Sequence, residues 1–290
     1  MRRAAWVSDN GWTVAFDARG PFYLTELTST LGAAAETSRA PRQDGVTTWH
    51  TALDARTVNL TGGMWIFGDR LHPAKAEYDR QRACLHQAFA PNRWGTLTYY
   101  KEDEAVQVRC RPIATPTIGS PAGTYSTIDI TFTTDSPYWE SAEEIVETLG
   151  VITRLWHFTW TPVKEPMGAF SPYATGSNPT GVDIYPIIEV YTTSQYVTVS
   201  NLDTGEFVTI EHAIAEGQKL VIDMQDVTAI LWERDESGDY HEKEDVSHWM
   251  SLDSTPWCLK PGGSRITISN EAPEDTPVAY VRYRIPSLGV

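Results

Sequence analysis

The chain has 290 residues and a formal net charge of −15, and 41% of its residues are hydrophobic and 11% aromatic. This composition excludes an intrinsically disordered chain, and the length suits two domains of ordinary size. An acidic surface repels phosphate backbones, so ordinary nucleic-acid binding is not expected. The chain also carries eleven tryptophans and many short apolar runs between turn residues, which favours β structure.

We expect no targeting, membrane or disulfide segment. Residues 1–10 contain basic side chains but lack the apolar run of a secretory signal. No stretch approaches the roughly 20 apolar residues of a spanning helix. Cys84, Cys110 and Cys258 are too few and too scattered for a disulfide framework or a zinc site. Synthesis in a reducing cytoplasm fits this pattern, with no membrane partner.

The first 70 residues predict short strands separated by turns. Turn-forming residues occupy 17–21, the loop 39–45 ends in Asp44-Gly45, and Thr61-Gly62-Gly63 is interpreted as a turn between two strands. The strands expected here are 11–16, 22–27, 47–52, 56–60 and 64–67.

Residues 73–89 predict the one convincing helix. Pro73 suits the first helical position, where its missing N–H costs nothing, and Pro91 ends the helix. The spacing of the apolar residues predicts an amphipathic helix that packs on a sheet. The residues sharing this face are Ala74, Tyr78, Leu85 and Phe89.

Three strands with clean alternation are expected next, at 96–100, 105–113 and 126–133. The Pro- and Gly-rich loop 115–123 between the last two is interpreted as a hairpin tip. A second, short helix is expected at 141–149, where Ser141 is a suitable N-cap.

The second half is expected to be β throughout, following an irregular connection that reaches residue 181. About seven strands over ~110 residues predict a β-sandwich. The strands expected are 184–191, 195–200, 206–210, 219–223, 227–233, 264–269 and 278–283.

The order and spacing of several short segments resemble one known family. In the first half the segments are Pro41…Asp44-Gly45, Phe89-Ala90-Pro91, Gly95-Thr96-Leu97-Thr98-Tyr99, Val108-Arg109-Cys110-Arg111-Pro112 and Asp135-Ser136-Pro137-Tyr138-Trp139. In the second half they include Gly176-Ser177-Asn178, Tyr185-Pro186-Ile187-Ile188-Glu189-Val190, Gly217-Gln218-Lys219-Leu220-Val221-Ile222-Asp223, Leu259-Lys260-Pro261-Gly262-Gly263-Ser264 and Val281-Arg282-Tyr283-Arg284. Together they are similar to the distal tail proteins of siphophages, the long non-contractile-tailed bacteriophages.

The resemblance implies a mainly β fold with two modules. Residues 1–140 would form a tail-tube-like β-barrel or sandwich with one packed α-helix, 141–181 a helical or irregular connection, and 182–290 a galectin-like β-sandwich. Six copies would close into a ring at the virion tail tip, after assembly in the host cytoplasm. The ring would contact the tail-tube protein, the tail-tip hub protein and receptor-binding or baseplate proteins, and DNA would pass through its bore without specific binding.

One segment invites a metal-site interpretation, from His241 to His248 with carboxylates between. The two imidazoles are seven residues apart and no third ligand has convincing spacing. A solvated loop or hairpin end explains the segment, and we predict no metal site.

A second group imitates the acid pair of a glycosidase: Glu140, Glu143 and Glu144 beside Tyr138 and Trp139. Paired carboxylates catalyse glycoside hydrolysis only at a set separation across a cleft. Stabilisation by the dipole of the expected helix at 141–149 explains these residues without catalysis.

The remaining candidates also favour a chain without catalytic or cofactor-binding residues. No Gly-x-Ser-x-Gly elbow or phosphate-binding glycine motif occurs, and none of the three cysteines has an evident activating neighbour. Trp156, Phe158 and Trp160 could form a sugar platform, but packing of the connection is the more common use of such aromatics. We therefore predict a structural, non-enzymatic protein; the alternatives are a carbohydrate-binding β-sandwich protein that mediates host-surface attachment and, more remotely, a polysaccharide-degrading enzyme.

Overall fold

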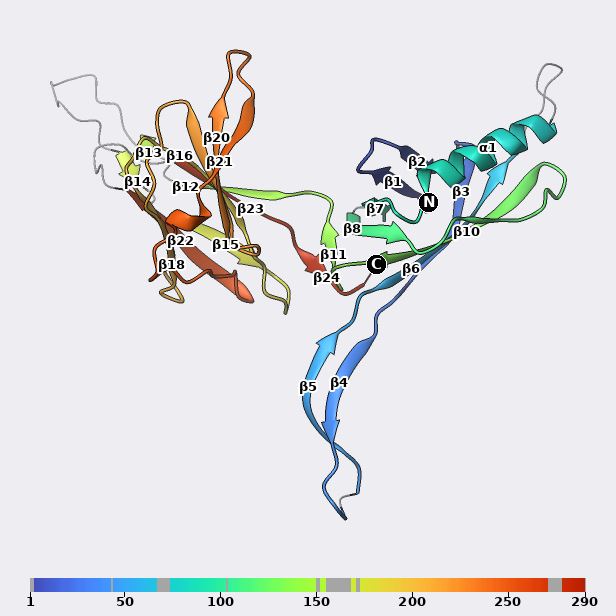
Figure 1. Cartoon of the computed structure of the whole chain (residues 1–290), viewed down its shortest axis with the longest axis horizontal. Coiled ribbons are helices and arrows are strands. Elements are labelled where there is room, and N and C mark those ends of the chain that lie inside the picture. The colour runs from blue at the N-terminus through green and yellow to red at the C-terminus, as the bar shows by residue number, and fades with distance from the viewer. Residues whose placement is uncertain are drawn as a thin grey trace. The chain divides into compact units, whose positions relative to one another are not determined.

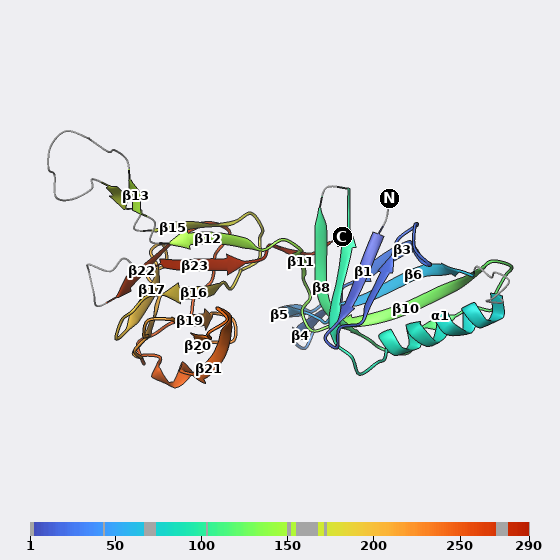
Figure 2. The same ribbon diagram turned by 90° about the horizontal axis from the view of Figure 1, so that it is seen from above.

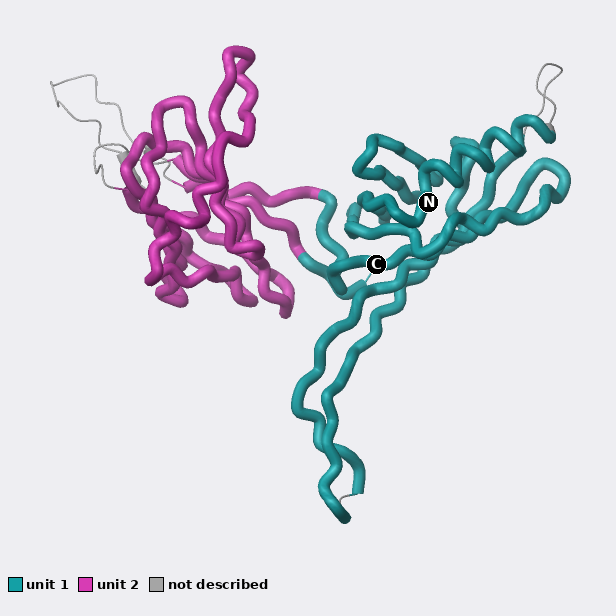
Figure 3. The backbone as a smooth tube through the Cα atoms, in the orientation of Figure 1, with its two compact units in different colours: residues 1–142, 286–290 teal, residues 143–285 magenta. Residues whose placement is uncertain are grey.

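The computed structural model describes residues 3–42, 44–66, 74–102, 104–149, 152–154, 168–170, 173–270 and 278–289. The chain forms two compact units (Figure 3). Unit 1 contains residues 1–142 and 286–290, and unit 2 contains residues 143–285. The expectation of a mainly β protein with one α-helix is confirmed, since the described strands form antiparallel sheets and one α-helix accompanies them.

Unit 1 is organised around one large sheet with strand order β2-β1-β7-β8-β10-β6-β3. The ends of this path, β2 and β3, are consecutive in the chain, and the Asp17 N–H donates to the Phe22 carbonyl at 2.9 Å. The sheet therefore curls back on itself. Its main strands are β1 (Arg3–Ser8), β2 (Thr13–Phe16), β3 (Phe22–Thr30), β6 (Thr57–Trp65), β7 (Gly95–Tyr100), β8 (Ala105–Pro112) and β10 (Tyr125–Thr134).

Three short strands extend this sheet. Strand β9 (Thr117–Ile118) pairs with β10, so the expected hairpin tip at 115–123 folds back against the sheet. Strand β11 (Trp139–Ser141) pairs with both β8 and β24 (Pro286–Ser287). The last residues of the chain are thereby part of unit 1.

Helix α1 (Ala74–Ala88) packs on the inner face of this sheet (Figure 2). Leu85 and Phe89 are fully buried, and the Phe89 ring lies 5.6 Å from that of Trp6 and 5.9 Å from that of Phe132. Tyr78 packs at the edge of the same cluster. The predicted helix is thus confirmed for the described residues, which exclude Pro73 and the side chain of Ala74.

The turn expected at residues 61–63 is wrong, because β6 runs through it without interruption from Thr57 to Trp65. The two glycines serve close packing instead. A Cβ on Gly62 would lie 2.4 Å from the Tyr23 carbonyl oxygen, and one on Gly63 would lie 2.4 Å from the Tyr23 hydroxyl. Glycine is needed here so that β3 and the Tyr23 ring can lie directly on β6.

Strands β3 and β6 continue into a separate two-stranded arm that projects from unit 1 (Figure 1). It consists of β4 (Ala33–Ser38) and β5 (Thr47–Leu53), and every residue of both strands is exposed. The turn between them carries positive φ at Arg42 (67°) and Gly45 (82°). We call residues 33–53 the hairpin arm.

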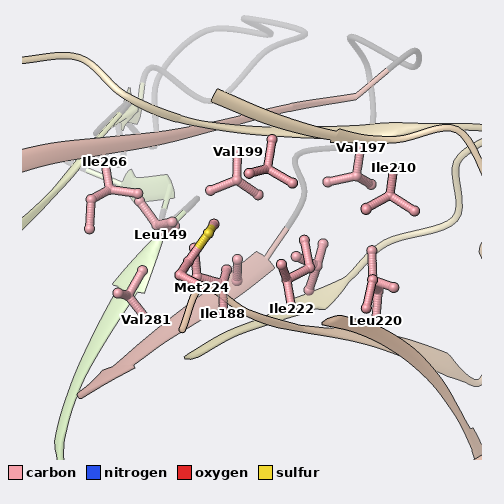
Figure 4. Close-up of a cluster of buried hydrophobic side chains, with 14 of the residues drawn as sticks. Leu149, Ile188, Val197, Val199, Ile210, Leu220, Ile222, Met224, Ile266 and Val281 are labelled. Atoms are coloured by element: carbon pink, nitrogen blue, oxygen red, sulfur yellow. The ribbon is translucent and has the colours of Figure 1, made fainter. Parts of the chain in front are cut away.

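Unit 2 is a β-sandwich. Its larger sheet has the order β12-β23-β16-β19-β20-β21, and its smaller sheet β15-β22-β17-β18. Apolar side chains from both sheets meet between them, among them Ile188, Val199, Leu220 and Ile266 (Figure 4). The larger sheet contains β12 (Ile145–Leu149), β16 (Ile187–Tyr191), β19 (Gln218–Asp223), β20 (Thr228–Arg234), β21 (Tyr240–Asp245) and β23 (Val278–Tyr283); the smaller contains β15 (Ala174–Asn178), β17 (Val197–Asn201), β18 (Phe207–Ile210) and β22 (Gly262–Asn270).

The second helix expected at 141–149 is also wrong. Residues 145–149 form β12, which pairs with β23 in the order Ile145↔Tyr283 to Leu149↔Ala279. Leu149 enters the sandwich core, and Ile145 packs against it. Sheet pairing and core packing therefore override the N-cap signal of Ser141.

The remaining elements are short. Strands β13 (Ile152–Arg154) and β14 (Gly168–Phe170) pair with each other, and a 3-10 helix, η1 (Ser247–Trp249), follows β21. None of the helices in the described ranges is long and apolar enough to cross a membrane.

Candidate assembly surfaces

The structure separates the two histidines of the metal candidate. His241 lies in β21, where its Nε2 is 2.8 Å from the Asp235 carboxylate. His248 lies in η1, and its ring contacts that of Trp249 at 5.4 Å. Within the described ranges, no three His, Cys, Asp or Glu side chains are grouped so that they could hold a metal ion.

The glutamates of the acid-pair candidate take part in strand pairing and in an ion pair rather than in a catalytic pair. Glu140 is a residue of β11, and the Glu144 carboxylate accepts hydrogen bonds from Arg282 at 2.6 and 2.8 Å. Trp139 is fully buried, and its indole N–H points to Ser29 Oγ at 3.4 Å. A buried indole offers no platform for a sugar.

The cysteines are unpaired thiols. Burial raises the thiol pKa of both Cys110 and Cys258, which disfavours the reactive thiolate. Cys84 is half-buried on α1. The sugar-platform candidates Trp156, Phe158 and Trp160 lie outside the described residues.

The hairpin arm is the most exposed regular structure of unit 1. The Trp49 side chain is 74% exposed, and its indole N–H donates to Ser38 Oγ on the opposite strand at 2.6 Å. Val46 and Leu53 are also exposed. A two-stranded hairpin without an apolar face to bury is marginally stable by itself in water. Both sides of the arm are therefore uncovered by its own chain.

A second surface is the outer face of β3, β6 and β10, opposite the side that packs on α1. The cross-strand pairs Thr28↔Asn59↔Thr131 lie on it, and Thr61 donates to Asp129 at 2.9 Å. We call this surface the threonine face. Its polar residues are Glu26, Thr28, Thr30, Thr57, Asn59, Thr61, Thr127, Asp129, Thr131 and Thr133, and the same side of the three strands continues into Tyr23, Gly63, Trp65 and Tyr125.

A third surface lies outside β1, β7 and β8 and combines cations with aromatic rings. Arg3 lies 4.2 Å from the centre of the Tyr100 ring. Arg109 and Arg111 approach Trp94 at 5.9 and 5.6 Å, and Arg109 also pairs with Asp9 at 2.8 Å. We call this surface the arginine face. It meets the threonine face where Arg111 pairs with Thr133.

One arginine in unit 1 is buried. Arg56 is 2% exposed and donates to the Pro137 carbonyl at 2.8 Å, to Ser29 Oγ at 2.6 Å and to the Leu288 carbonyl at 2.8 Å. All three acceptors are neutral, and burial lowers the pKa of the guanidinium. This side chain connects β3, the loop before β11 and the C-terminal segment.

Unit 2 has a charged and aromatic cluster on the outer face of its larger sheet. Lys219 Nζ lies 5.0 to 5.8 Å from the ring centres of Tyr191, Trp232 and Tyr240 and 3.4 Å from the Glu189 carboxylate. Glu189 in turn pairs with Arg282 at 2.5 Å. The protein's own lysine thus occupies the space among these rings. We call this group the Lys219 cluster.

Sequence reasoning missed most of these surfaces for identifiable reasons. The strands β1, β4, β15 and β21 were not expected, and without β4 the arm could not be recognised. Residues 33–38 show no alternation of apolar and polar side chains, because neither side of the arm is buried. The sequence gives one sign of the arm: a large apolar side chain, Trp49, lies in the strand expected at 47–52.

The C-terminal part of the chain matches a known family. Residues 179–283 match the model of the siphovirus-type tail component, C-terminal domain. No curated protein sequence matches the chain.

Solved structures match the whole chain. The Dit protein (gp 19.1) of phage SPP1, described as a paradigm of the hub adsorption apparatus in phages that infect Gram-positive bacteria, superposes with a TM-score of 0.64 and 13% identity. The match covers 98% of this chain and 99% of that one. Chains from the phage P2 baseplate, in its activated conformation with calcium and with strontium, each superpose with a TM-score of 0.57 and 11% identity over 100% of both chains.

Proposed function

Because residues 179–283 match the C-terminal domain of the siphovirus-type tail component, and the whole chain has the fold of the SPP1 Dit protein, we propose that six copies form a ring at the virion tail tip. The fold implied by the resemblance is confirmed, and the family match covers residues 179–283. The hexamer, its partners and its role as a conduit belong to the proposal.

In this proposal unit 1, corresponding to the expected ring domain at 1–140, makes the ring. Unit 2, which contains residues 182–285 of the sandwich domain expected at 182–290, serves as an attachment platform. The ring joins the tail-tube protein to the tail-tip hub protein and to receptor-binding or baseplate proteins. DNA passes through the bore during ejection, and the chain carries out no chemistry. Assembly takes place in the host cytoplasm.

The hairpin arm is the observation that carries the proposal. Its ladder has no apolar side buried by its own chain, and its Trp49 is 74% exposed. Each of its strands also presents one edge that lacks a pairing strand within the two-stranded sheet. A closed ring supplies every copy with the same neighbour, which would cover each arm in turn.

The oligomeric state tests the proposal. Full-length chain, alone and mixed with the hub and tube proteins of the same tail, would be measured by light scattering and imaged in negative stain. We expect a six-fold ring in at least one of these mixtures. A chain that stays monomeric at high concentration with both partners present would contradict the proposal.

The aromatic cluster on the larger sheet of unit 2 does not favour the carbohydrate-binding alternative. The aromatic side chains on the outer face of the larger sheet enclose Lys219 and contact one another, so their faces are already occupied. Sugar stacking needs an accessible ring face.

A further inference from the structure

The chain passes between the two units twice, at residues 142–143 and at residues 285–286 (Figure 3). Strand β11 ends just before the first crossing, and β24 begins at the second. The two strands pair with each other, and their register places Trp139 opposite Ser287. Both covalent connections to unit 2 therefore reach unit 1 at the same short ladder.

The side chain of Arg56 connects this ladder to the base of the hairpin arm. Arg56 lies between β5 and β6, where the arm returns to the sheet. Its Nε donates to the Pro137 carbonyl, just before β11, and its Nη2 donates to the Leu288 carbonyl, just after β24, both at 2.8 Å. Its Nη1 donates to Ser29 Oγ at 2.6 Å, near the end of β3 where the arm begins. One guanidinium thus bonds to the base of the arm and to both sides of the ladder.

The backbone of Arg56 is fixed at the same point. Its N–H donates to Thr134 Oγ1 at 3.1 Å, and its carbonyl accepts from the Thr134 N–H at 3.1 Å. The Thr134 hydroxyl also donates to the Ser136 carbonyl at 2.6 Å, in the loop that leads into β11. The guanidinium therefore extends from a backbone that is itself held at the end of β10.

The chemistry of the guanidinium suits the positioning of several segments at once. All three acceptors of Arg56 are neutral, and desolvation of the buried charge offsets part of what these hydrogen bonds contribute to stability. What the group supplies is geometry, because its planar fork directs donors to several acceptors in fixed directions. A change at one acceptor is then felt at the other two.

We propose that Arg56 is a positioning residue that couples the hairpin arm to the two chain crossings, so that a displacement of unit 2 alters the arm. The inference rests on the proposed function, in which a neighbouring copy covers the arm and unit 2 carries attached proteins. A hairpin of marginal stability depends on how firmly its base is held. When β24 moves, the Leu288 acceptor is lost, the guanidinium can turn, and Ser29 at the base of the arm is held less firmly.

The test uses the reciprocity of coupling, since a change on the side of the arm must also be felt at the crossing. Ser29→Ala removes the acceptor on β3, and Thr28→Ala, at the exposed residue beside it, is the matched control. Each substitution is made in the unmodified chain and in the Arg56→Gln chain. Hydrogen exchange followed by mass spectrometry of the isolated full-length chain compares the peptides that cover the arm and residues 286–289.

The expected pattern is an effect of Ser29 that depends on Arg56. In the unmodified chain, Ser29→Ala should speed exchange at residues 286–289 by about three-fold or more, and Thr28→Ala should leave it unchanged. Arg56→Gln should speed exchange both there and in the arm. Ser29→Ala should then add nothing further at 286–289 in the Arg56→Gln chain. Two residues with separate structural roles would instead give additive effects.

Two results would overturn the proposal. Unchanged exchange at residues 286–289 in the Ser29→Ala chain would show that the arm and the crossing are not coupled. An equal effect of Ser29→Ala with and without Arg56 would assign the coupling to the Trp139 indole, which lies 3.4 Å from Ser29 Oγ.

Arg56→Lys, which keeps the charge and loses the fork, replaces Arg56→Gln if the latter does not fold, and the same pattern is expected. The exchange is measured on the isolated chain, so its outcome does not depend on assembly. A chain that forms no ring contradicts the proposed function alone, whereas a ring-forming chain with additive exchange contradicts the coupling alone.

Discussion

The two units differ in how far their own side chains cover the outer surfaces of their sheets. Unit 2 covers the outer face of its larger sheet with its own ion pairs and rings, in which Lys219 and Glu189 are each nearly buried. Unit 1 instead extends a hairpin arm with no apolar side covered by its own chain. Unit 2 thus covers this sheet surface with its own side chains, whereas unit 1 leaves the arm uncovered, and the proposed ring would cover it.

The largest expected effect concerns the core that supports the surfaces of unit 1. Phe89→Ala should lower the free energy of unfolding of unit 1 by about 3–5 kcal/mol, because it removes a fully buried ring between α1 and the sheet. Calorimetry would show an earlier transition for unit 1 only. Phe89→Leu is the control, with a smaller loss. If unit 2 melts equally early, the units are not independent and the comparison fails.

The next effect concerns the C-terminal segment of unit 1. Arg56→Met should lower the stability of unit 1 by about 2–3 kcal/mol, since three buried or half-buried acceptors lose a charged donor. Hydrogen exchange should speed up at residues 286–289 and in β11. The exposed Arg109→Met is the matched control, with a change below about 0.5 kcal/mol. Unchanged exchange at 286–289 would show that Arg56 does not hold this segment.

A smaller and pH-dependent effect is expected in unit 2. Burial opposes the charge of Glu189, but hydrogen bonds from Arg282 and Tyr191 and the charge of Lys219 outweigh it and lower its pKa below the ordinary value of 4.5. The unfolded state therefore binds the proton more readily. The stabilisation by Glu189 is complete above about pH 5 and is lost as the pH falls through the folded pKa.

Glu189→Gln tests this dependence. The variant should be less stable than the unmodified chain by about 1–2 kcal/mol near neutral pH, and the difference should shrink as the pH falls below about 4. Urea unfolding of unit 2 at several pH values measures it. Glu233→Gln, at an exposed pair with Lys243, is the control for a solvent-screened carboxylate. A difference that does not change with pH would show that the lost stability is packing rather than charge.

The sequence predicts the strands and the helix where one side is buried. Val106, Val108 and Cys110 alternate with polar residues and form β8, and Leu85 and Phe89 mark the buried side of α1. In contrast, Gly62-Gly63 looks like a turn because the pattern carries no sign of the Tyr23 ring that requires them. Such a contact between segments 40 residues apart is set by the tertiary fold.

The assembly surfaces are less predictable than the fold. The threonine face is readable as the polar side of Ser126–Thr133, but nothing local tells whether a polar side meets water, a neighbour or a bore. Arg56 stands alone in its segment, and its acceptors at Ser29, Pro137 and Leu288 are distant in the chain. Only the fold brings them together.

The smallest effect on stability should accompany the clearest effect on assembly. Trp49→Ser removes an indole that is 74% exposed, so the free energy of unfolding of either unit should change by less than about 0.5 kcal/mol. If a neighbouring copy covers the arm, the same indole is buried in the ring, and its loss should weaken ring formation by about ten-fold or more. Trp12→Ser, a partly exposed tryptophan outside the arm, is the control and should leave the ring intact. Mass photometry over a dilution series measures both. If the Trp49→Ser chain assembles as readily as the unmodified one, no neighbouring copy covers the indole, and the arm faces solvent in the ring. The contrast between a self-contained unit 2 and an incomplete unit 1 would then be lost.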